Sequence, residues 1–315
     1  MNSNRAMDIS VIIVSWNVRE YLKTCLASIY HSRTRADIEV IVVDNKSSDE
    51  SPRMVEAEFP QVKLIVNSAN LGYAKANNIA LKESKARNVL FLNPDTELCD
   101  DTLVQMKLLM DRHAGWSGIA CKLIYPDGTL QENCRHFPSL FTDLMESLYL
   151  DWAFPKNRFF NYYRMGSWMH DRERIVDVPY GACFMVRRSV LDNIGPMDER
   201  FFMYYDEIDL CRRIKKAGRS IWYTPDIKVI HHSNKSSGQV PEKVFEWKYT
   251  SKILYFEKHF GRWSVCALVM NLLLKTAIVW GLFGLGHLIF SRPKDLEYIK
   301  KDIRAAWSVF AKALK

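Results

Sequence analysis

Three carboxylates stand within four positions in the stretch "FFMYYDEIDLCRR", which runs from Phe201 to Arg213. Asp206, Glu207 and Asp209 directly follow five large apolar or aromatic residues. A carboxyl group in an aromatic-walled cleft has a raised pKa, because desolvation disfavours its charged form, and it can then act as a general base near neutral pH. The alternative is structural: Asp206 would cap a helix, and all three acids would interact favourably with the helix dipole.

The same stretch has the spacing of a helix that begins near Asp206. Asp209 could then pair with Arg213 four residues later. The buried stripe of this helix is expected to comprise Ile208, Cys211 and Ile214. The three acids would therefore have separate environments and separate roles.

Four further polar clusters each follow a short apolar run: "SWN" at 15–17, "DNKSSD" at 44–49, "NSANLGYAKANN" at 67–78 and "NPDTE" at 93–97. Asp44 could accept a hydrogen bond from a pyrimidine imide N–H or a ribose hydroxyl. Asp95 could hold a divalent cation that bridges two phosphates, since hard cations prefer carboxylate oxygen. Any one cluster could be a simple turn, but turn chemistry does not require a carboxylate directly after two separate β-branched runs. Together the clusters predict a nucleoside diphosphate ligand.

The elements that position these clusters alternate between strand and helix. Strands are expected at 9–14, 38–44, 62–66 and 88–93, and helices at 21–32, 49–58, 73–84 and 101–113. This order predicts an α/β fold with a mostly parallel sheet flanked by helices and a ligand beyond the carboxyl ends of the strands. The fingerprints GxGxxG and GxxxxGK[ST] are missing, which disfavours a dinucleotide-binding dehydrogenase and a P-loop NTPase.

Composition sets the outer limits. A chain of 315 residues with 48% apolar residues can bury an ordinary core, so disorder is not expected. The net charge of +8 is compatible with nucleic acid, an anionic membrane or phosphorylated ligands, and bulk charge does not choose among them. The seven cysteines are scattered without a CxxC pair, and the polar N-terminus lacks a signal-peptide core. We therefore expect reduced thiols in a cytosolic compartment.

Seven segments in order resemble one known family: "VIIVSWN", "VVDNKSSD", "NLGYAKANN", "FLNPDTE", "GACFMVRR", "FFMYYDEIDLCRRIKKAG" and "VIHHSNKSS". They are similar to those of the inverting family-2 glycosyltransferases with the GT-A fold, and in particular to rhamnosyltransferases of cell-envelope polysaccharide assembly. The resemblance runs from about Ile9 to about Ser237, roughly three quarters of the chain. It implies a transferase that moves a sugar from a nucleotide-sugar donor.

The resemblance assigns the nucleotide pocket by position. Asp44 would bind the nucleobase of the donor, which the resemblance suggests is a dTDP- or UDP-sugar. The other residues that would shape this pocket are Ser15, Asn17, Ser47, Asn70, Gly72 and Asn77.

The resemblance also assigns a metal site for Mg²⁺ or Mn²⁺. Asp95 would bind the cation, together with His231 at the end of a strand that feeds a Ser-rich loop. Many relatives carry an acid two positions before Asp95, where this chain has Asn93, so Asn93 would be a weak ligand or a donor contact. His232 would lie outside the ligand set.

The general base falls on Glu207, because relatives have Glu-Asp at this position and use the second acid of the pair. Here the pair reads Asp206-Glu207, and the longer Glu side chain leaves both acids as catalytic candidates. The base would deprotonate the acceptor hydroxyl as it attacks the anomeric carbon opposite the leaving nucleoside diphosphate.

The C-terminal part has a different composition. Residues 263–290 are almost wholly apolar, apart from Asn271, Lys275 and His287, and a charged segment with helical spacing follows. The run is long enough to span a bilayer, but basic residues flank both of its ends and Lys275 lies within it. We therefore expect a glycosyltransferase domain at 1–260 and helices at 261–315 that lie in the membrane surface.

The resulting hypothesis is a metal-dependent enzyme at the cytoplasmic face of the inner membrane. Its acceptor would be a lipid-linked saccharide, and no nucleic-acid partner is expected. A membrane-bound nucleotide-sugar-binding scaffold with a degenerate site is the alternative, and a nucleotidyltransferase with the same sheet order is a third option. The combination of Asp44, Asp95, Glu207 and His231 favours the enzyme.

Overall fold

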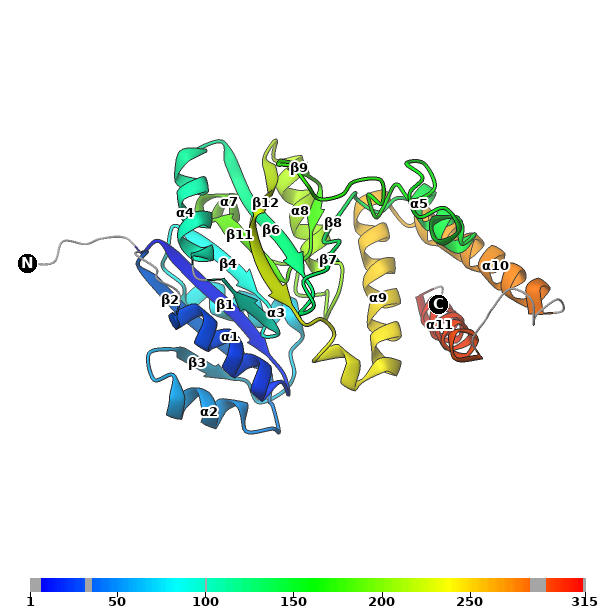
Figure 1. The fold of residues 1–315 in the computed structure, drawn as a ribbon. Coiled ribbons are helices and arrows are strands. Elements are labelled where there is room, and N and C mark those ends of the chain that lie inside the picture. Colours follow the sequence, from blue (N-terminus) through cyan, green and yellow to red (C-terminus); the bar gives the residue numbers. More distant parts are fainter. Residues whose placement is uncertain (1–6, 32–35, 100, 284–292, 314–315) are drawn as a thin grey trace, which may run out of the picture. The chain divides into compact units, whose positions relative to one another are not determined.

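The computed structural model describes residues 7–31, 36–99, 101–283 and 293–313 (Figure 1). Its contacts divide the chain into two compact units. Unit 1 consists of residues 1–135, 170–202 and 206–239, and unit 2 consists of residues 136–169, 203–205 and 240–315. The expected division into a catalytic domain at 1–260 and a membrane region at 261–315 concerns function and stays a prediction. By packing, residues 136–169 and 240–260 group with the C-terminal helices.

Unit 1 begins with four strands and four helices in alternation, as the sequence predicts. The strands are β1 (Ile9–Ser15), β2 (Ile38–Asp44), β3 (Lys63–Val66) and β4 (Asn88–Leu92). The helices are α1 (Arg19–His31), α2 (Ser51–Glu58), α3 (Tyr73–Glu83) and α4 (Thr102–Arg112). The strands pair in parallel in the order β3-β2-β1-β4, and every residue of β1 and β4 is buried. Burial on both faces explains why these strands have continuous apolar runs.

The rest of unit 1 makes the sheet mixed. It contributes β5 (Thr96–Leu98), β6 (Trp116–Ile124), β7 (Leu130–Gln131), β8 (Cys134–Arg135), β9 (Arg174–Val176), β10 (Val178–Pro179), β11 (Cys183–Arg187), α7 (Arg188–Ile194), α8 (Asp206–Lys216), β12 (Ser220–His231) and the short 3-10 helix η1 (Ser237–Gln239). The large sheet has the order β3-β2-β1-β4-β11-β6-β12-β5, with β7 beside β6 and β9 beside β12. β11 runs antiparallel to both β4 and β6. The mostly parallel α/β architecture is therefore confirmed.

Helix α8 begins at Asp206, and Arg213 Nε donates a hydrogen bond to Asp209 Oδ2 over 2.9 Å. The expected apolar stripe is buried. The prediction that Asp206 caps the helix is wrong, because Asp206 is already its first helical residue. The two preceding tyrosines, Tyr204 and Tyr205, have left-handed backbone angles, with φ of 66° and 61°. The chain therefore turns before Asp206, whose own side chain is buried.

Unit 2 is built from helices. They are α5 (Leu140–Ser147), α6 (Leu150–Ala153), α9 (Pro241–Phe260), α10 (Trp263–Phe283) and α11 (Pro293–Ala313). Helix α5 lies along α10, and α9 packs against both α10 and α11 (Figure 1). Of the long apolar run predicted at 263–290, residues 263–283 form α10 and the remainder lies outside the described residues.

Gly72 allows the chain to enter α3. Its φ of +82° lies in the left-handed half of the Ramachandran plot, and the next amide, Tyr73 N, donates to Phe202 O over 2.7 Å. A Cβ at position 72 would overlap with the Phe202 carbonyl. Gly128 has the same φ, but a Cβ there meets nothing within 4 Å.

We expect Gly72→Ala to destabilise the protein by about 2–4 kcal/mol, because steric overlap adds to backbone strain. The matched variant Gly128→Ala carries the backbone strain alone and should cost about 1 kcal/mol. Urea unfolding followed by circular dichroism measures both. Equal losses for the two variants would show that Phe202 yields and that the overlap contributes nothing.

Candidate active site

The carboxyl ends of β1 and β2 form one rim of the site. Ser15 and Asp44 are register partners in the parallel pair, so their side chains start from neighbouring positions. Asp44 Oδ1 accepts from Ser47 N over 2.8 Å, and Asp44 Oδ2 accepts from Ser47 Oγ over 2.5 Å. Burial raises the pKa of Asp44, and the two hydrogen bonds from Ser47 oppose that shift. The carboxylate keeps free lone pairs, which suit a nucleobase imide or a ribose hydroxyl.

Asn17 joins the two loops of this rim. It has a left-handed φ of 52°. Its backbone N–H donates to Ser47 Oγ over 2.9 Å, and its side-chain Oδ1 accepts from Ser48 N over 2.7 Å. Ser15 Oγ is buried and has no hydrogen-bond partner among the described residues. The structure therefore brings together the predicted Ser15, Asn17, Asp44 and Ser47.

The loop before α3 completes the rim. It is held there by Asn45, the residue after β2, which sequence analysis did not name as a site residue. Asn45 Nδ2 donates to Gly72 O over 3.1 Å, and Asn45 Oδ1 accepts from Asn67 Nδ2 over 2.9 Å. Asn70 Oδ1 accepts from Gly72 N over 3.0 Å. Asn77 is buried inside α3, where its Nδ2 donates to the carbonyl of the first helical residue over 2.9 Å. Asn70 and Gly72 thus shape the loop, whereas the amide nitrogen of Asn77 is used within its own helix.

Asp95 and His231 face each other on adjoining segments. β5 pairs antiparallel with β12, which brings His231 opposite the residue after Asp95, and His231 Nε2 lies 3.3 Å from Asp95 Oδ1. His231 Nδ1 lies 2.7 Å from Gln131 Oε1. Because that amide oxygen only accepts, we assign the hydrogen to Nδ1, and in the neutral ring Nε2 presents a lone pair to the carboxylate. Two facing acceptors require a cation or a proton between them.

This donor set fits a divalent cation that is shared with a substrate. No group of three His, Cys, Asp or Glu side chains suited to a metal exists within the described part of the chain. Mg²⁺ and Mn²⁺ sites in enzymes of phosphorylated substrates commonly use one or two protein ligands and complete the shell with phosphate oxygens and water. Asn93 is held in place by its backbone. Its backbone N–H donates to Ala182 O over 2.9 Å, and its backbone carbonyl accepts from Thr96 Oγ1 over 2.8 Å.

Gln131 is the residue at the Asp95–His231 pair that sequence analysis missed. It is buried, and it orients the imidazole of His231 from β7, one hundred positions earlier in the chain. A hydrogen-bond acceptor behind a metal-binding histidine fixes its tautomer and its ring orientation. His232 has a separate partner, Glu97 Oε1, at 2.5 Å from its Nε2.

The second acidic centre is the pair Asp206 and Glu207, whose carboxyls share a hydrogen bond. Asp206 is 2% exposed. Burial, and then the charge of Glu207, raise the pKa of Asp206 well above its ordinary value. Burial also raises the pKa of Glu207, but the Arg135 guanidinium and the hydrogen bond from Asp206 oppose that shift. The pKa of Asp206 is thus raised further than that of Glu207, so Glu207 is the better candidate for the ionised carboxylate of the pair.

Tyr73 and Gly181 adjoin Glu207. Tyr73 Oη donates to Gly181 O over 3.2 Å, and a Cβ built at Gly181 would lie 3.8 Å from Glu207 Cβ. Burial raises the pKa of Tyr73, and the charges of Asp206, Glu207 and Asp95 add to that rise. The Tyr73 hydroxyl is thus close enough to the acidic pair and to Asp95 to interact electrostatically with all three, so these groups belong to one region of unit 1.

Arg135 is a further residue that the sequence did not indicate. Its guanidinium lies 4.6 Å from the centroid of the Tyr180 ring, the residue before Gly181, and it lowers the pKa of Glu207. No local motif marks Arg135, because its relation to Glu207 exists only in three dimensions. Its positive charge favours the ionised form of Glu207.

Relatives with known names match most of this chain. A rhamnosyltransferase of Mycobacterium tuberculosis (strain CDC 1551 / Oshkosh), named N-acetylglucosaminyl-diphospho-decaprenol L-rhamnosyltransferase, is 31% identical over 268 residues, which cover 80% of this chain and 85% of that protein. The dTDP-rhamnosyl transferase RfbF of Shigella flexneri is 24% identical over 318 residues, with 97% and 95% coverage.

Solved structures and a family model complete the comparison. The mannosyltransferase PcManGT from Pyrobaculum calidifontis, in complex with GDP-Man and Mn²⁺, superposes with a TM-score of 0.55 at 17% identity and covers 97% of this chain and 88% of that one, which shows a shared GT-A fold. The model of Glycosyl transferase family 2 matches residues 10–195, a segment that includes the Asp44 rim and Asp95. With a match over more than half of its length, the chain belongs to glycosyl transferase family 2.

Proposed function

We propose that this protein is an inverting rhamnosyltransferase of cell-envelope polysaccharide synthesis. It moves rhamnose from a dTDP- or UDP-linked donor to a lipid-linked saccharide at the cytoplasmic face of the inner membrane. The observation that carries the proposal is the gathering of the Asp44 rim, the Asp95–His231 pair and the Asp206–Glu207 pair in unit 1. The named rhamnosyltransferases among its relatives support the choice of sugar.

Donor binding begins at the rim of β1 and β2. Asp44 accepts from the nucleobase or ribose, and the buried Ser15 hydroxyl has hydrogen-bonding capacity left for the same ligand. Asp95 and His231 hold the divalent cation, with Gln131 fixing the histidine. When bound, the cation stabilises the negative charge that develops on the leaving nucleoside diphosphate.

Sugar transfer then needs one base. Glu207 accepts the proton of the acceptor hydroxyl while that oxygen forms a bond to the anomeric carbon of the sugar. The bond from this carbon to the diphosphate oxygen breaks at the opposite face, and the diphosphate leaves with the electron pair. Asp206 is the poorer base because its carboxyl group is buried, which favours the protonated form. It acts instead as a hydrogen-bond donor that keeps Glu207 in place.

The proposal is tested by incubating the purified protein with a panel of nucleotide sugars, Mn²⁺ and a polyprenyl-diphosphate saccharide. We expect transfer of rhamnose, release of nucleoside diphosphate and an inverted anomeric centre, measured by mass spectrometry and NMR. Release of pyrophosphate would instead identify a nucleotidyltransferase. Donor binding without turnover of any sugar in the panel would identify a binding protein.

Glu207→Gln should lower kcat by about 10²–10⁴-fold, because the amide cannot accept the proton. The donor Kd should stay unchanged, since Glu207 faces the acceptor hydroxyl. The matched variant Asp206→Asn still donates to Glu207 and should keep kcat within about tenfold. Single-turnover kinetics and calorimetric donor titration measure both effects. A larger kcat loss in Asp206→Asn would reverse the assignment of the base.

Arg135→Gln should shift the acidic limb of the kcat/KM pH profile upward by roughly one pH unit. Arg135 lowers the pKa of Glu207, so its removal raises that pKa and Glu207 becomes protonated, and inactive, at a higher pH. Arg135→Lys keeps the positive charge and should shift the limb less. An acidic limb that stays in place in Arg135→Gln would exclude this electrostatic role.

Gln131→Leu should weaken Mn²⁺ binding in the presence of dTDP or UDP by about 10–100-fold, because His231 loses the acceptor that orients it. The exposed neighbour Glu132 provides the matched variant, Glu132→Gln, whose Mn²⁺ affinity should be unchanged. Electron paramagnetic resonance of free Mn²⁺ reports the affinity without relying on turnover. Equal affinity in the two variants would argue against a metal at His231.

A further inference from the structure

Helix α10 has its polarity reversed relative to an ordinary surface helix. Within 263–280 its exposed residues follow a helical spacing of three and four, with Leu273 and Leu274 adjacent, and all of them are apolar: Trp263, Cys266, Met270, Leu273, Leu274, Ala277 and Trp280. The two tryptophans at the ends of this stripe are 62% and 67% exposed. A helix at a water-facing surface places polar side chains on that side.

The polar side chains of α10 point into unit 2. Asn271 Nδ2 donates to Asp143 Oδ2 over 2.9 Å, and Lys275 Nζ donates to Asp302 Oδ2 over 2.5 Å. Thr276 Oγ1 accepts from Trp307 Nε1 over 3.1 Å. These contacts reach α5 and α11 and fix the rotation of α10 about its own axis. The apolar stripe is thereby held on the outside.

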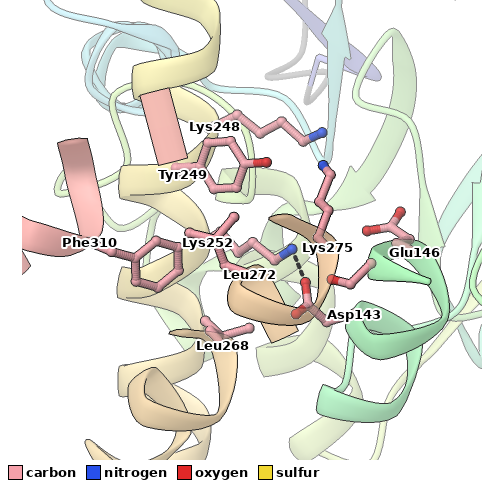
Figure 2. A pocket seen from close by; sticks show the side chains of 10 residues that line it. Asp143, Glu146, Lys248, Tyr249, Lys252, Leu268, Leu272, Lys275 and Phe310 are labelled. Carbon is pink, nitrogen blue, oxygen red and sulfur yellow. Dashed lines mark ion pairs between the residues drawn. The ribbon is translucent and has the colours of Figure 1, made fainter. Parts of the chain in front are cut away.

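A small polar cavity lies behind this face (Figure 2). Its volume is about 50 Å³, enough for a few water molecules. Lys252 from α9 forms an ion pair with Asp143 there, and Tyr249 donates to Asp302 over 3.0 Å. The interior of unit 2 thus contains ion pairs and a polar cavity, whereas one outer face of α10 is apolar.

Residues 136–169 extend the apolar surface. Ten of these 34 residues are aromatic, against 12% in the whole chain. Phe141 on α5 contacts Phe159 with ring centroids 4.9 Å apart, and Phe160 contacts both Phe159 and Phe154 at 5.5 and 5.2 Å. The exposed members of this aromatic segment are Phe141, Trp152, Phe154, Phe159, Tyr162 and Met169. Because α5 packs against α10, the aromatic segment adjoins the helix.

Nearly all of the net charge resides in the same unit. Unit 2 has 16 lysines and arginines against nine acids, a net charge of +7, while unit 1 has 28 against 27, a net charge of +1. Helix α11 exposes Lys300, Lys301, Arg304 and Lys312 along one side. Basic side chains in the same unit as an exposed aromatic surface suit a membrane with anionic lipid headgroups above an acyl layer.

We propose that the apolar stripe of α10 and the aromatic segment 136–169 together form a docking surface for an anionic lipid bilayer. This proposal rests on the proposed function, which places the protein at a membrane. The structural observations that support it all come from unit 2. The segment 263–280, which contains the stripe, has a mean hydropathy of 1.6 and the length of a membrane span. Only one face of α10 is exposed, and α5 and α6, with eight and four residues, are too short to cross. The surface therefore lies in the interface on one side of the bilayer.

The protein carries its own probes for this arrangement. Of its seven cysteines, two are exposed: Cys266 on the stripe of α10 and Cys99 in unit 1. A charged, membrane-impermeant maleimide is reacted with the full chain with and without phosphatidylglycerol–phosphatidylcholine vesicles. Cys266 should react at least about tenfold more slowly with vesicles, while Cys99 keeps its rate. Equal rates at Cys266 in both conditions would overturn the proposal.

A charge on the stripe tests the same surface. Met270→Glu with Leu274→Glu should reduce binding to anionic vesicles at least about tenfold, and the control Leu108→Glu places the same charge on an exposed leucine of α4 in unit 1. Thermal stabilisation by dTDP or UDP monitors folding. If the double variant keeps vesicle binding but changes a dimer into a monomer by light scattering, the stripe is instead a contact between copies of the chain.

Two further outcomes are decisive. Alkaline carbonate should release the bound protein, whereas its retention would mean that α10 crosses the bilayer and that the one-sided arrangement is wrong. The proposed function fails separately: if no rhamnose is transferred, even to a water-soluble acceptor analogue, while vesicles still protect Cys266, the docking surface stands without that function.

Discussion

The in-register parallel pairing of β1 with β2 is the constraint on which the site depends. Because the two strands run side by side to Ser15 and Asp44, their polar ends meet at one edge of the sheet. Asn17, Ser47 and Asn45 then connect the adjoining loops by side-chain hydrogen bonds. A shift of one residue in this register would turn every buried side chain of β1 to the opposite face. Core packing therefore fixes the position of the pocket.

Local patterns in the sequence predicted much of unit 1. The four initial strands and their helices follow from apolar runs and helical spacing, and the Asp209–Arg213 pair follows from its spacing of four. Contacts between distant segments could not be predicted in the same way. Gln131 reaches His231 from one hundred positions away, and Arg135 on β8 affects Glu207 on helix α8. No short motif records such a contact.

The capping role predicted for Asp206 failed for a physical reason that also clarifies the site. A capping carboxylate accepts backbone amides at a helix end, which lowers its pKa. Asp206 instead lies inside the first turn, buried against the carboxyl of Glu207. Burial raises the pKa of Asp206 further than that of Glu207, and the Arg135 guanidinium favours the charged form of Glu207. The order Asp-Glu therefore assigns the two positions different chemistry.

In unit 2, hydropathy alone could not show which way α10 faces. An apolar run of this length suits a buried core helix, a span or a helix in the interface, and all three have the same composition. The polar contacts separate these cases, because Asn271 and Lys275 have their partners on the inner side. On the outer side, Trp263 and Trp280 stay largely exposed. Removing one partner of the Lys275–Asp302 pair would leave a buried charge. The same contacts that stabilise the helices therefore keep the apolar stripe turned outward.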